Sequence, residues 1–109
     1  MSMLDNLLQL RDGPRDGAML RFGIANEYAR LPDWPQAATY ARQAVTLQHD
    51  FSAAWKLLGK ALLQAGQPQD ALAAYHEGIA IAEGKGDIQA AKEMKVFARR
   101  IEKQLAAGE

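Results

Sequence analysis

Few side chains in this sequence could do chemistry, and their spacing does not bring them together. The strongest candidates for acid–base or metal chemistry are His49, His76 and the neighbouring Glu77. Two imidazoles bind zinc from one helical face when they occupy the ends of an HExxH motif, and these two histidines do not have that spacing. We therefore expect both histidines to be solvated or to lie at the edge of an interface.

The segment Gly84-Lys85-Gly86-Asp87 contains residue types that phosphate-binding loops use. Such a loop needs the full GxxxxGK[ST] spacing after a strand, whereas this segment follows a helical pattern and lacks that spacing. The end of one helix and the start of the next explain it. No serine lies in a GxSxG motif, and the carboxylates are scattered along the chain. The sequence therefore predicts no enzyme, no cofactor and no metal site.

Composition excludes further classes of protein. The 109 residues include 13 basic and 13 acidic side chains and no cysteine. Balanced charge gives no global field that would attract nucleic acid or an anionic membrane, and the absence of cysteine removes disulfides and thiolate chemistry. No apolar run approaches the roughly 18 residues of a membrane span, and the first ten residues do not resemble a signal peptide. We expect one soluble, cytoplasmic domain that binds neither nucleic acid nor membrane.

Hydrophobic residues recur at helical steps along the chain, so helices are expected to position its side chains. Ser2 and Asp5 predict a capping box at the start of a short helix. Asp16 is the predicted N-cap of a second helix, which continues to about Leu31, and Asp33 is the predicted N-cap of a third. The proline and glycine residues between these segments mark the expected turns.

The segment 52–75 shows the pattern most clearly. Trp55, Leu58 and Leu62 recur at steps of three and four, so they share one helical stripe. Gly59 lies beside that stripe and leaves room for a second helix to approach. These spacings are typical of two antiparallel helices packed face to face.

An interval of 34 residues relates this segment to the one before it. The matched pairs are Ile24 and Leu58, Ala25 and Gly59, Tyr28 and Leu62, Ala37 and Ala71, Ala41 and Tyr75, and Ala44 and Gly78. The interval and the W-x2-L-G-x2-L spacing resemble the tetratricopeptide repeat family, and in particular small bacterial-type members with two repeats plus flanking helices. The resemblance implies an all-α fold in which antiparallel helix pairs stack as a short right-handed α-solenoid.

The resemblance also implies a division of the chain. We expect a single domain over 1–109, with an N-terminal helix at 2–11, repeat 1 at 18–51, repeat 2 at 52–85 and a C-terminal capping helix at 87–106. Repeat arrays generally need about three units to bury their faces, so the flanking helices would supply the missing contact surface.

In this family the first helix of each pair lines a concave surface in which partners lie. The resemblance therefore implies a partner-binding groove lined by Met19, Phe22, Asn26, Arg30, Ala53, Lys56, Leu57, Lys60 and Gln64. Asn26 stands where members that clamp a C-terminal carboxylate have an asparagine. Phe22 and Leu57 replace two other residues of that clamp, so we do not predict carboxylate clamping.

Charge in the expected groove suggests what it binds. Lys56 and Lys60 are like charges one turn apart, which destabilises a helix by roughly 0.2–0.5 kcal/mol. Two lysines extended into solvent explain this pair, and the alternative is a functional surface. On that alternative, the groove takes an acidic or amphipathic peptide segment, with Phe22 and Leu57 as its apolar contacts.

A second candidate surface lies on the last helix. Its expected outer side carries Lys92, Val96, Arg99, Arg100 and Lys103. These residues form either a solvated face or a contact surface for anionic groups or another subunit.

The sequence thus predicts a non-enzymatic adaptor or scaffold that binds a protein or peptide in the groove. Two alternatives stay open. One is a structural protein that forms homo-oligomers through an exposed helix face, and the other is a helper subunit of an enzyme complex. The identity of the partner does not follow from the sequence.

Overall fold

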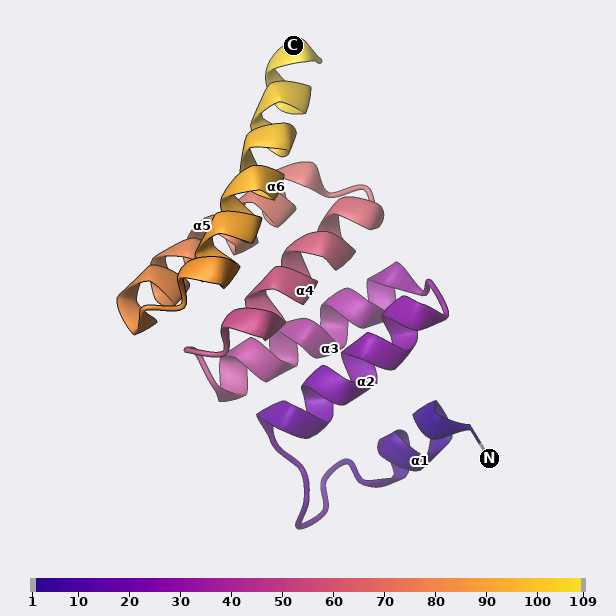
Figure 1. The fold of residues 1–109 in the computed structure, drawn as a ribbon. Helices are drawn as coiled ribbons and strands as arrows, with labels where there is room; N and C mark the ends of the chain where they lie inside the picture. The colour runs from indigo at the N-terminus through magenta and orange to yellow at the C-terminus, as the bar shows by residue number, and fades with distance from the viewer. Residues whose placement is uncertain (1, 109) are drawn as a thin grey trace.

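Six helices form a serial stack in the computed structural model, which describes residues 2–108 (Figure 1). They are α1 (Met3–Gln9), α2 (Ala18–Arg30), α3 (Trp34–Leu47), α4 (Ser52–Gln64), α5 (Pro68–Lys85) and α6 (Ile88–Ala107). Each helix packs mainly on its neighbours in the chain, and the described residues contain no strand. The predicted all-α fold of stacked antiparallel helix pairs is confirmed. None of the helices in this part of the chain is long and apolar enough to cross a membrane.

Local side-chain chemistry caps the starts of three of the six helices, α1, α3 and α6. The Ser2 and Asp5 capping box is present at α1, and the side chain of Asp33 accepts a hydrogen bond from the Gln36 amide at the start of α3. The side chain of Asp87 does the same for the Ala90 amide of α6. These contacts satisfy amides that have no partner inside the first helical turn.

The predicted N-cap of α2 is wrong. The cap position is Gly17, which has no side chain to accept a hydrogen bond, and the helix begins at Ala18. The Asp16 carboxylate instead binds the guanidinium of Arg21, whose Nε donates to Asp16 Oδ1 at 2.9 Å. The carboxylate that the local pattern assigned to the helix start therefore binds a charged side chain five residues away instead.

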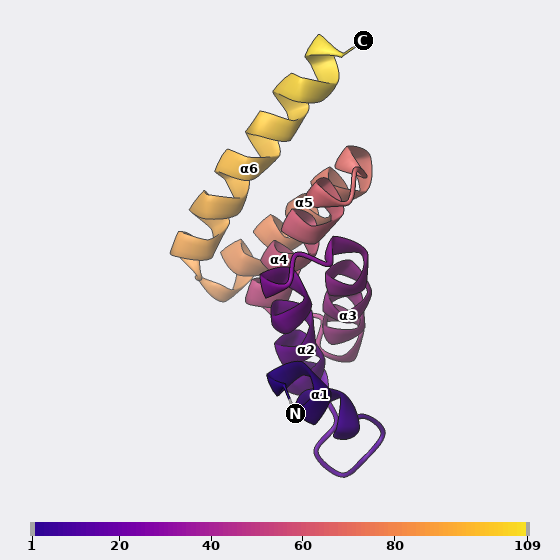
Figure 2. The same ribbon diagram turned by 90° about the vertical axis from the view of Figure 1, so that its right-hand side faces the viewer.

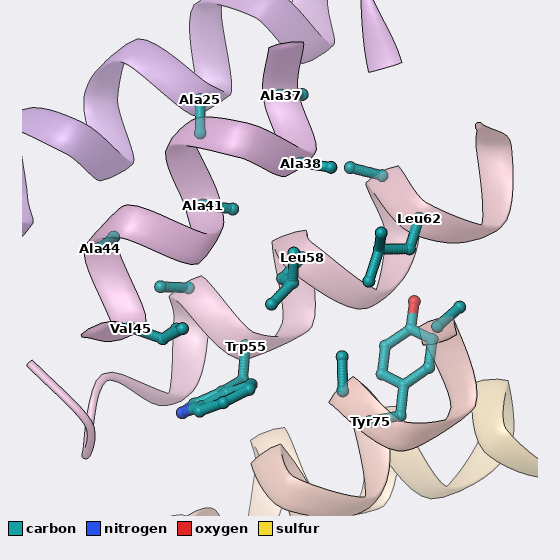
Figure 3. Packing of buried hydrophobic residues seen from close by; sticks show 14 of the residues in the cluster. Ala25, Ala37, Ala38, Ala41, Ala44, Val45, Trp55, Leu58, Leu62 and Tyr75 are labelled. Atoms are coloured by element: carbon teal, nitrogen blue, oxygen red, sulfur yellow. The ribbon is translucent and has the colours of Figure 1, made fainter. Parts of the chain in front are cut away.

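Small side chains bring the helices close together in the core. Ala25 of α2 and Ala37, Ala41 and Ala44 of α3 are fully buried, and Figure 3 shows these short side chains along the helices. The larger side chains of Trp55, Leu58, Leu62 and Tyr75 fill the space around α4 and α5. Close-packed interiors lose stability when even one methylene is added or removed, so these positions are sensitive to size.

Two glycines mark the tightest approaches. A Cβ on Gly59 of α4 would lie 2.6 Å from the ring of Tyr75 on α5. A Cβ on Gly78 of α5 would lie 2.7 Å from the sulfur of Met94 on α6 and 2.8 Å from the Cβ of Trp55 on α4. Gly78 is therefore the point at which α4, α5 and α6 meet.

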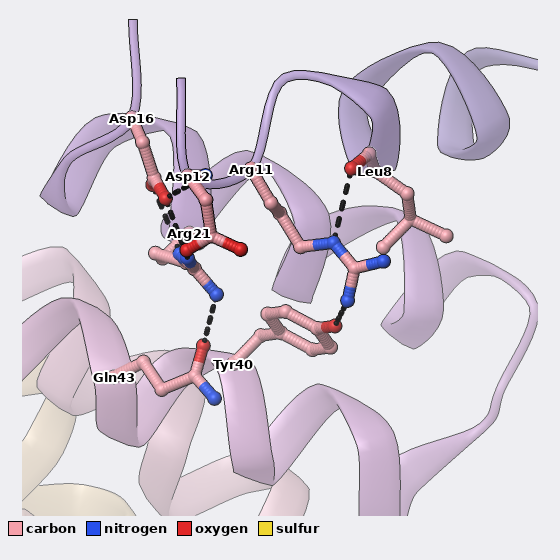
Figure 4. A network of polar contacts seen from close by, with 7 residues as sticks. All are labelled: Leu8, Arg11, Asp12, Asp16, Arg21, Tyr40 and Gln43. Carbon is pink, nitrogen blue, oxygen red and sulfur yellow. Dashed lines mark hydrogen bonds and ion pairs between the residues drawn. The ribbon is translucent and has the colours of Figure 1, made fainter. Parts of the chain in front are cut away.

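Polar contacts complete the attachment of α1, which has no fully buried residue of its own. The chain just after α1 is held by Arg11, whose Nε donates to the Leu8 carbonyl at 3.0 Å and whose Nη1 donates to the Tyr40 hydroxyl at 2.7 Å (Figure 4). Arg21 of α2 adds a second polar contact to α3, since its Nη1 donates to Gln43 Oε1 at 2.9 Å. The apolar side chains of Leu4, Leu7 and Leu8 are partly buried and pack against the core.

The first prediction concerns Gly59. We expect Gly59→Ala to lower the free energy of unfolding by about 1–3 kcal/mol, because the new methyl group would overlap the Tyr75 ring. Gly84→Ala is the matched control, since no atom other than those of its chain neighbours and the local helix backbone lies within 4 Å of its Cβ position in α5, and it should raise stability by roughly 0.5–1 kcal/mol. Urea unfolding of both variants measures this. A Gly59→Ala protein as stable as the wild type would contradict the packing.

The second prediction concerns Asp16, whose pKa is lowered from 3.8 to about 2, chiefly by the hydrogen bond from Arg21 and next by the Asp12 amide. A carboxyl pKa that is lower in the folded protein than in the unfolded chain stabilises the fold at pH values above the unfolded-state pKa. This contribution disappears as the pH falls through the folded-state pKa. Asp16→Asn should therefore be less stable than the wild type at neutral pH, and the difference should shrink as pH falls from 3.8 to about 2.

Melting temperatures measured against pH test this expectation. In an Arg21→Met background, adding Asp16→Asn should change stability little, because the partner of the carboxylate is already gone. A gap between Asp16→Asn and wild type that stays constant with pH would refute the assignment.

Candidate functional site

A groove with a volume of about 770 Å³ opens between α4 and α6, within the range of roughly 300–1,000 Å³ typical of ligand sites. In the side view, α6 extends away from α2 toward its C-terminal end (Figure 2), and it contacts α4 as well as α5. The groove is lined by Phe22 and Asn26 of α2, by Ala53, Lys56, Leu57, Lys60, Leu63 and Gln64 of α4, by Tyr75 of α5, and by Glu93, Phe97, Arg100, Ile101 and Gln104 of α6.

Most of the side chains predicted from the sequence lie together in this groove. They are Phe22, Asn26, Ala53, Lys56, Leu57, Lys60 and Gln64. Met19 and Arg30 are not among the lining residues. Met19 is 72% exposed, and Arg30 donates to the Glu27 carboxylate of its own helix at 2.9 Å. Whether each lining residue contacts a partner stays a prediction.

Sequence reasoning missed the wall that α6 contributes. Glu93, Phe97, Arg100, Ile101 and Gln104 recur at helical steps of three and four, so they share one face of that helix. This spacing was visible in the sequence, but nothing there indicated that the face would turn toward α4.

The sequence predicts Arg100 on the outer side of α6 together with Lys92, Val96, Arg99 and Lys103, but the structure places it elsewhere. It lines the groove, and its guanidinium carbon is 5.9 Å from the ring centroid of Phe97. Arg99 and Arg100 are about 100° apart around the helix axis, so they present different faces. Lys92, Arg99 and Lys103 are exposed and Val96 is 44% exposed, and within residues 2–108 no ion pair involves these three cations.

Aromatic side chains form the apolar part of the groove. Phe22 of α2 packs on Phe51 with ring centroids 4.7 Å apart, and Tyr75 of α5 packs on Phe97 of α6 at 5.6 Å. Leu57 and Leu63 of α4 also line the groove and are partly buried against the core. The apolar contacts expected from Phe22 and Leu57 are therefore available at the groove surface.

The charge of the groove is not set by Lys56 and Lys60 alone. Lys56 Nζ lies 2.7 Å from Glu93 Oε2 on α6, so its charge is compensated within the protein. The pKa of the Glu93 carboxyl is lowered, first by the hydrogen bond from Lys56 and then by the one from Gln89. Lys60 forms no ion pair within residues 2–108, and its Nζ lies 5.6 Å from the ring centroid of Trp34.

The histidines lie outside the groove. His49 Nε2 is 3.1 Å from Glu77 Oε1, its carbonyl accepts a hydrogen bond from the Trp55 indole at 2.8 Å, and His76 is exposed. Across the described residues, no group of three or more His, Cys, Asp or Glu side chains could hold a metal ion.

Stacked antiparallel helix pairs beside an open groove define the helical-repeat class of interaction domains. The chain is 39% identical to the TPR repeat-containing protein PA0015 of Pseudomonas aeruginosa over 101 residues, which cover 93% of this chain and 96% of that protein. This chain therefore belongs to the tetratricopeptide repeat family, although no protein-family model matches it. Proteins of this family are generally non-enzymatic modules of protein–protein interaction.

Solved structures agree with this assignment. The solution structure of protein BPP2914 from Bordetella parapertussis matches with a TM-score of 0.83 and 32% identity, covering 98% of this chain and 93% of that one. A tetratricopeptide repeat domain protein from Salinibacter ruber matches with a TM-score of 0.73 and 22% identity, covering 84% and 91%. MamA matches with a TM-score of 0.68 and 19% identity, covering 95% and 69%. The last two likenesses concern the fold alone.

The third prediction concerns the ion pair that crosses the groove. Because Lys56 is the main cause of the lowered pKa of Glu93, Lys56→Met should raise that pKa toward its ordinary value of 4.5. NMR titration of the Glu93 side-chain carboxyl measures the change directly. Lys95→Met is the control, since Lys95 binds Glu83 rather than Glu93 and should leave the Glu93 titration where it is. Equal titration curves in wild type and Lys56→Met would show that the pair does not persist in solution.

Proposed function

We propose that this protein is a non-enzymatic adaptor or scaffold that binds an acidic or amphipathic segment of another protein in the groove. The observation that carries the proposal is the combination of side chains in that groove. Three cations, Lys56, Lys60 and Arg100, line it beside a single carboxylate, Glu93, and aromatic and leucine side chains lie between them. An excess of positive charge beside apolar surface favours a segment with both acidic and apolar residues.

The apolar part of the groove would supply most of the affinity. Burying one large apolar side chain contributes roughly 1.5–3 kcal/mol, whereas an exposed ion pair contributes about 0–1 kcal/mol. Partner residues that pack on Phe22, Leu57 and Phe97 would therefore hold the segment, and the cations would fix its orientation and select its charge.

Recognition here needs no covalent step. The lining side chains stand on α2, α4, α5 and α6 rather than on loops, so the surface is largely formed before the partner arrives. Such preorganisation lowers the entropy lost on binding. A groove between helices accepts an amphipathic helix through apolar residues at helical spacing.

The helix pairs support a division into two repeats. We assign α2 and α3 to repeat 1 at 18–51, and α4 and α5 to repeat 2 at 52–85. On this assignment α1 covers one end of the stack and α6 covers the other. The buried residues Ala91, Met94, Ala98 and Ile101 of α6 support its role as a covering helix.

Self-association through the outer face of α6 is the second candidate, and the exposed Val96 favours it. A two-fold contact would use the same patch on both copies, so it would bring Lys92, Arg99 and Lys103 near their own counterparts. Like charges at such a contact oppose association, and the groove is therefore the better-supported surface. Sedimentation over a range of concentrations distinguishes the two, because a monomer at high concentration contradicts self-association.

The fourth prediction compares the two surfaces. Lys56→Glu combined with Lys60→Glu should weaken capture of native partners by at least about threefold, because attraction becomes repulsion at two groove positions. Lys92→Glu combined with Lys103→Glu changes the net charge equally on the outer face of α6 and should leave capture unchanged.

Quantitative affinity capture from native lysate, with circular dichroism to confirm folding, provides the measurement. If the outer-face variant loses its partners while the groove variant keeps them, the proposal is wrong and α6 provides the binding surface.

A further inference from the structure

The ion pair between Lys56 and Glu93 spans the groove from α4 to α6, with 2.7 Å between Nζ and Oε2. Both side chains remain partly exposed, at 39% for Lys56 and 37% for Glu93. The pair therefore lies at the mouth of the site in contact with solvent, where water and other charged groups compete for both partners.

The fold does not depend on this pair. Helix α6 is held by the buried side chains of Met94 and Ile101 and by the close contact of Met94 with Gly78. An exposed pair adds little to that attachment. Lys56 and Glu93 can consequently separate while α6 stays in place.

Glu93 is nevertheless directed toward Lys56. Gln89, one turn earlier on α6, donates from Nε2 to Glu93 Oε1 at 3.1 Å, and this leaves Oε2 to meet the lysine. The carboxylate thus occupies the position beside Lys56 that the carboxylate of a bound segment would take.

The other two cations of the groove are placed differently. Lys60 lies over the Trp34 ring and Arg100 lies over the Phe97 ring, and neither is paired with a carboxylate in the ion pairs of residues 2–108. Within residues 2–108, Lys56 is the one lining cation that is paired with an acidic side chain of the protein itself.

We propose that Glu93 is an internal competitor, and that the partner is an amphipathic helical segment whose carboxylate displaces Glu93 from Lys56. This inference rests on the proposed function and adds the chemistry of the partner and the residue that limits its affinity. In the complex Glu93 would lose its lysine and remain as a negative charge near the bound segment, so both competition and repulsion lower affinity. Removing that charge should strengthen binding.

The experiment uses two synthetic peptides of equal length, each with leucine at helical spacing. One carries glutamate at the intervening positions near the leucines, and the other carries glutamine at the same positions. Their dissociation constants are measured by fluorescence anisotropy against the full chain as wild type, Glu93→Gln and Glu83→Gln.

Glu83→Gln is a matched control. Glu83 of α5 pairs with Lys95 of α6 at the same 2.7 Å, with side chains 49% and 43% exposed, and neither residue lines the groove. The two variants therefore change net charge equally and each breaks one exposed pair to α6. Any general effect of the lost charge or of weaker α6 attachment on peptide affinity therefore appears in both variants.

We expect Glu93→Gln to bind the glutamate peptide about twofold to fivefold more tightly than the wild type does, as an exposed pair allows. The glutamine peptide should bind wild type and Glu93→Gln equally, and Glu83→Gln should bind both peptides as the wild type does. Unchanged or weaker binding of the glutamate peptide to Glu93→Gln overturns the competitor role, and so does an equal gain in Glu83→Gln or with the glutamine peptide.

Failure of the proposed function gives a different result. If neither peptide binds any of the three proteins, or if Lys56→Glu with Lys60→Glu leaves the binding of the glutamate peptide unchanged, the groove is not an acidic-segment site and both conclusions are withdrawn. Binding that requires the lysines but ignores Glu93 overturns only the inference about the competitor.

Discussion

The close approach of neighbouring helices is the constraint on which this structure depends. At Gly59 and Gly78 a side chain of any size would overlap the helix packed against it, and the alanines of α3 allow similar contacts. Because dispersion contacts weaken steeply with distance, a small increase in separation would lose many of them at once. The stack is therefore stabilised by many short-range contacts between adjacent helices rather than by one large central core.

The same constraint positions the groove. Met94 packs against Gly78, and together with the buried Ala91, Ala98 and Ile101 it forms the face that α6 turns toward the rest of the stack. With Met94 facing inward, Phe97 contacts Tyr75 and the face containing Glu93 and Arg100 turns toward α4. The buried face of α6 thus determines which polar side chains stand opposite Lys56.

Charge in the groove is arranged by contacts between helices rather than within them. Lys56 and Lys60 look like an unfavourable pair on one helix, yet Glu93 compensates the first and the Trp34 ring lies beside the second. A cation over an aromatic face and an exposed ion pair each contribute only modestly to stability. The groove keeps a net positive character although the chain as a whole is neutral.

The sequence by itself determined the helices and their family. Ser2, Asp33 and Asp87 mark helix starts through their own side chains, and the 34-residue interval identifies the repeating pair. These signals are local or periodic, so they can be read without coordinates. Only the tertiary structure decided that Asp16 binds Arg21 instead of capping α2, that Arg100 lies in the groove, and that Glu93 meets Lys56. Contacts between different helices depend on the rotation of each helix about its axis, and packing sets that rotation.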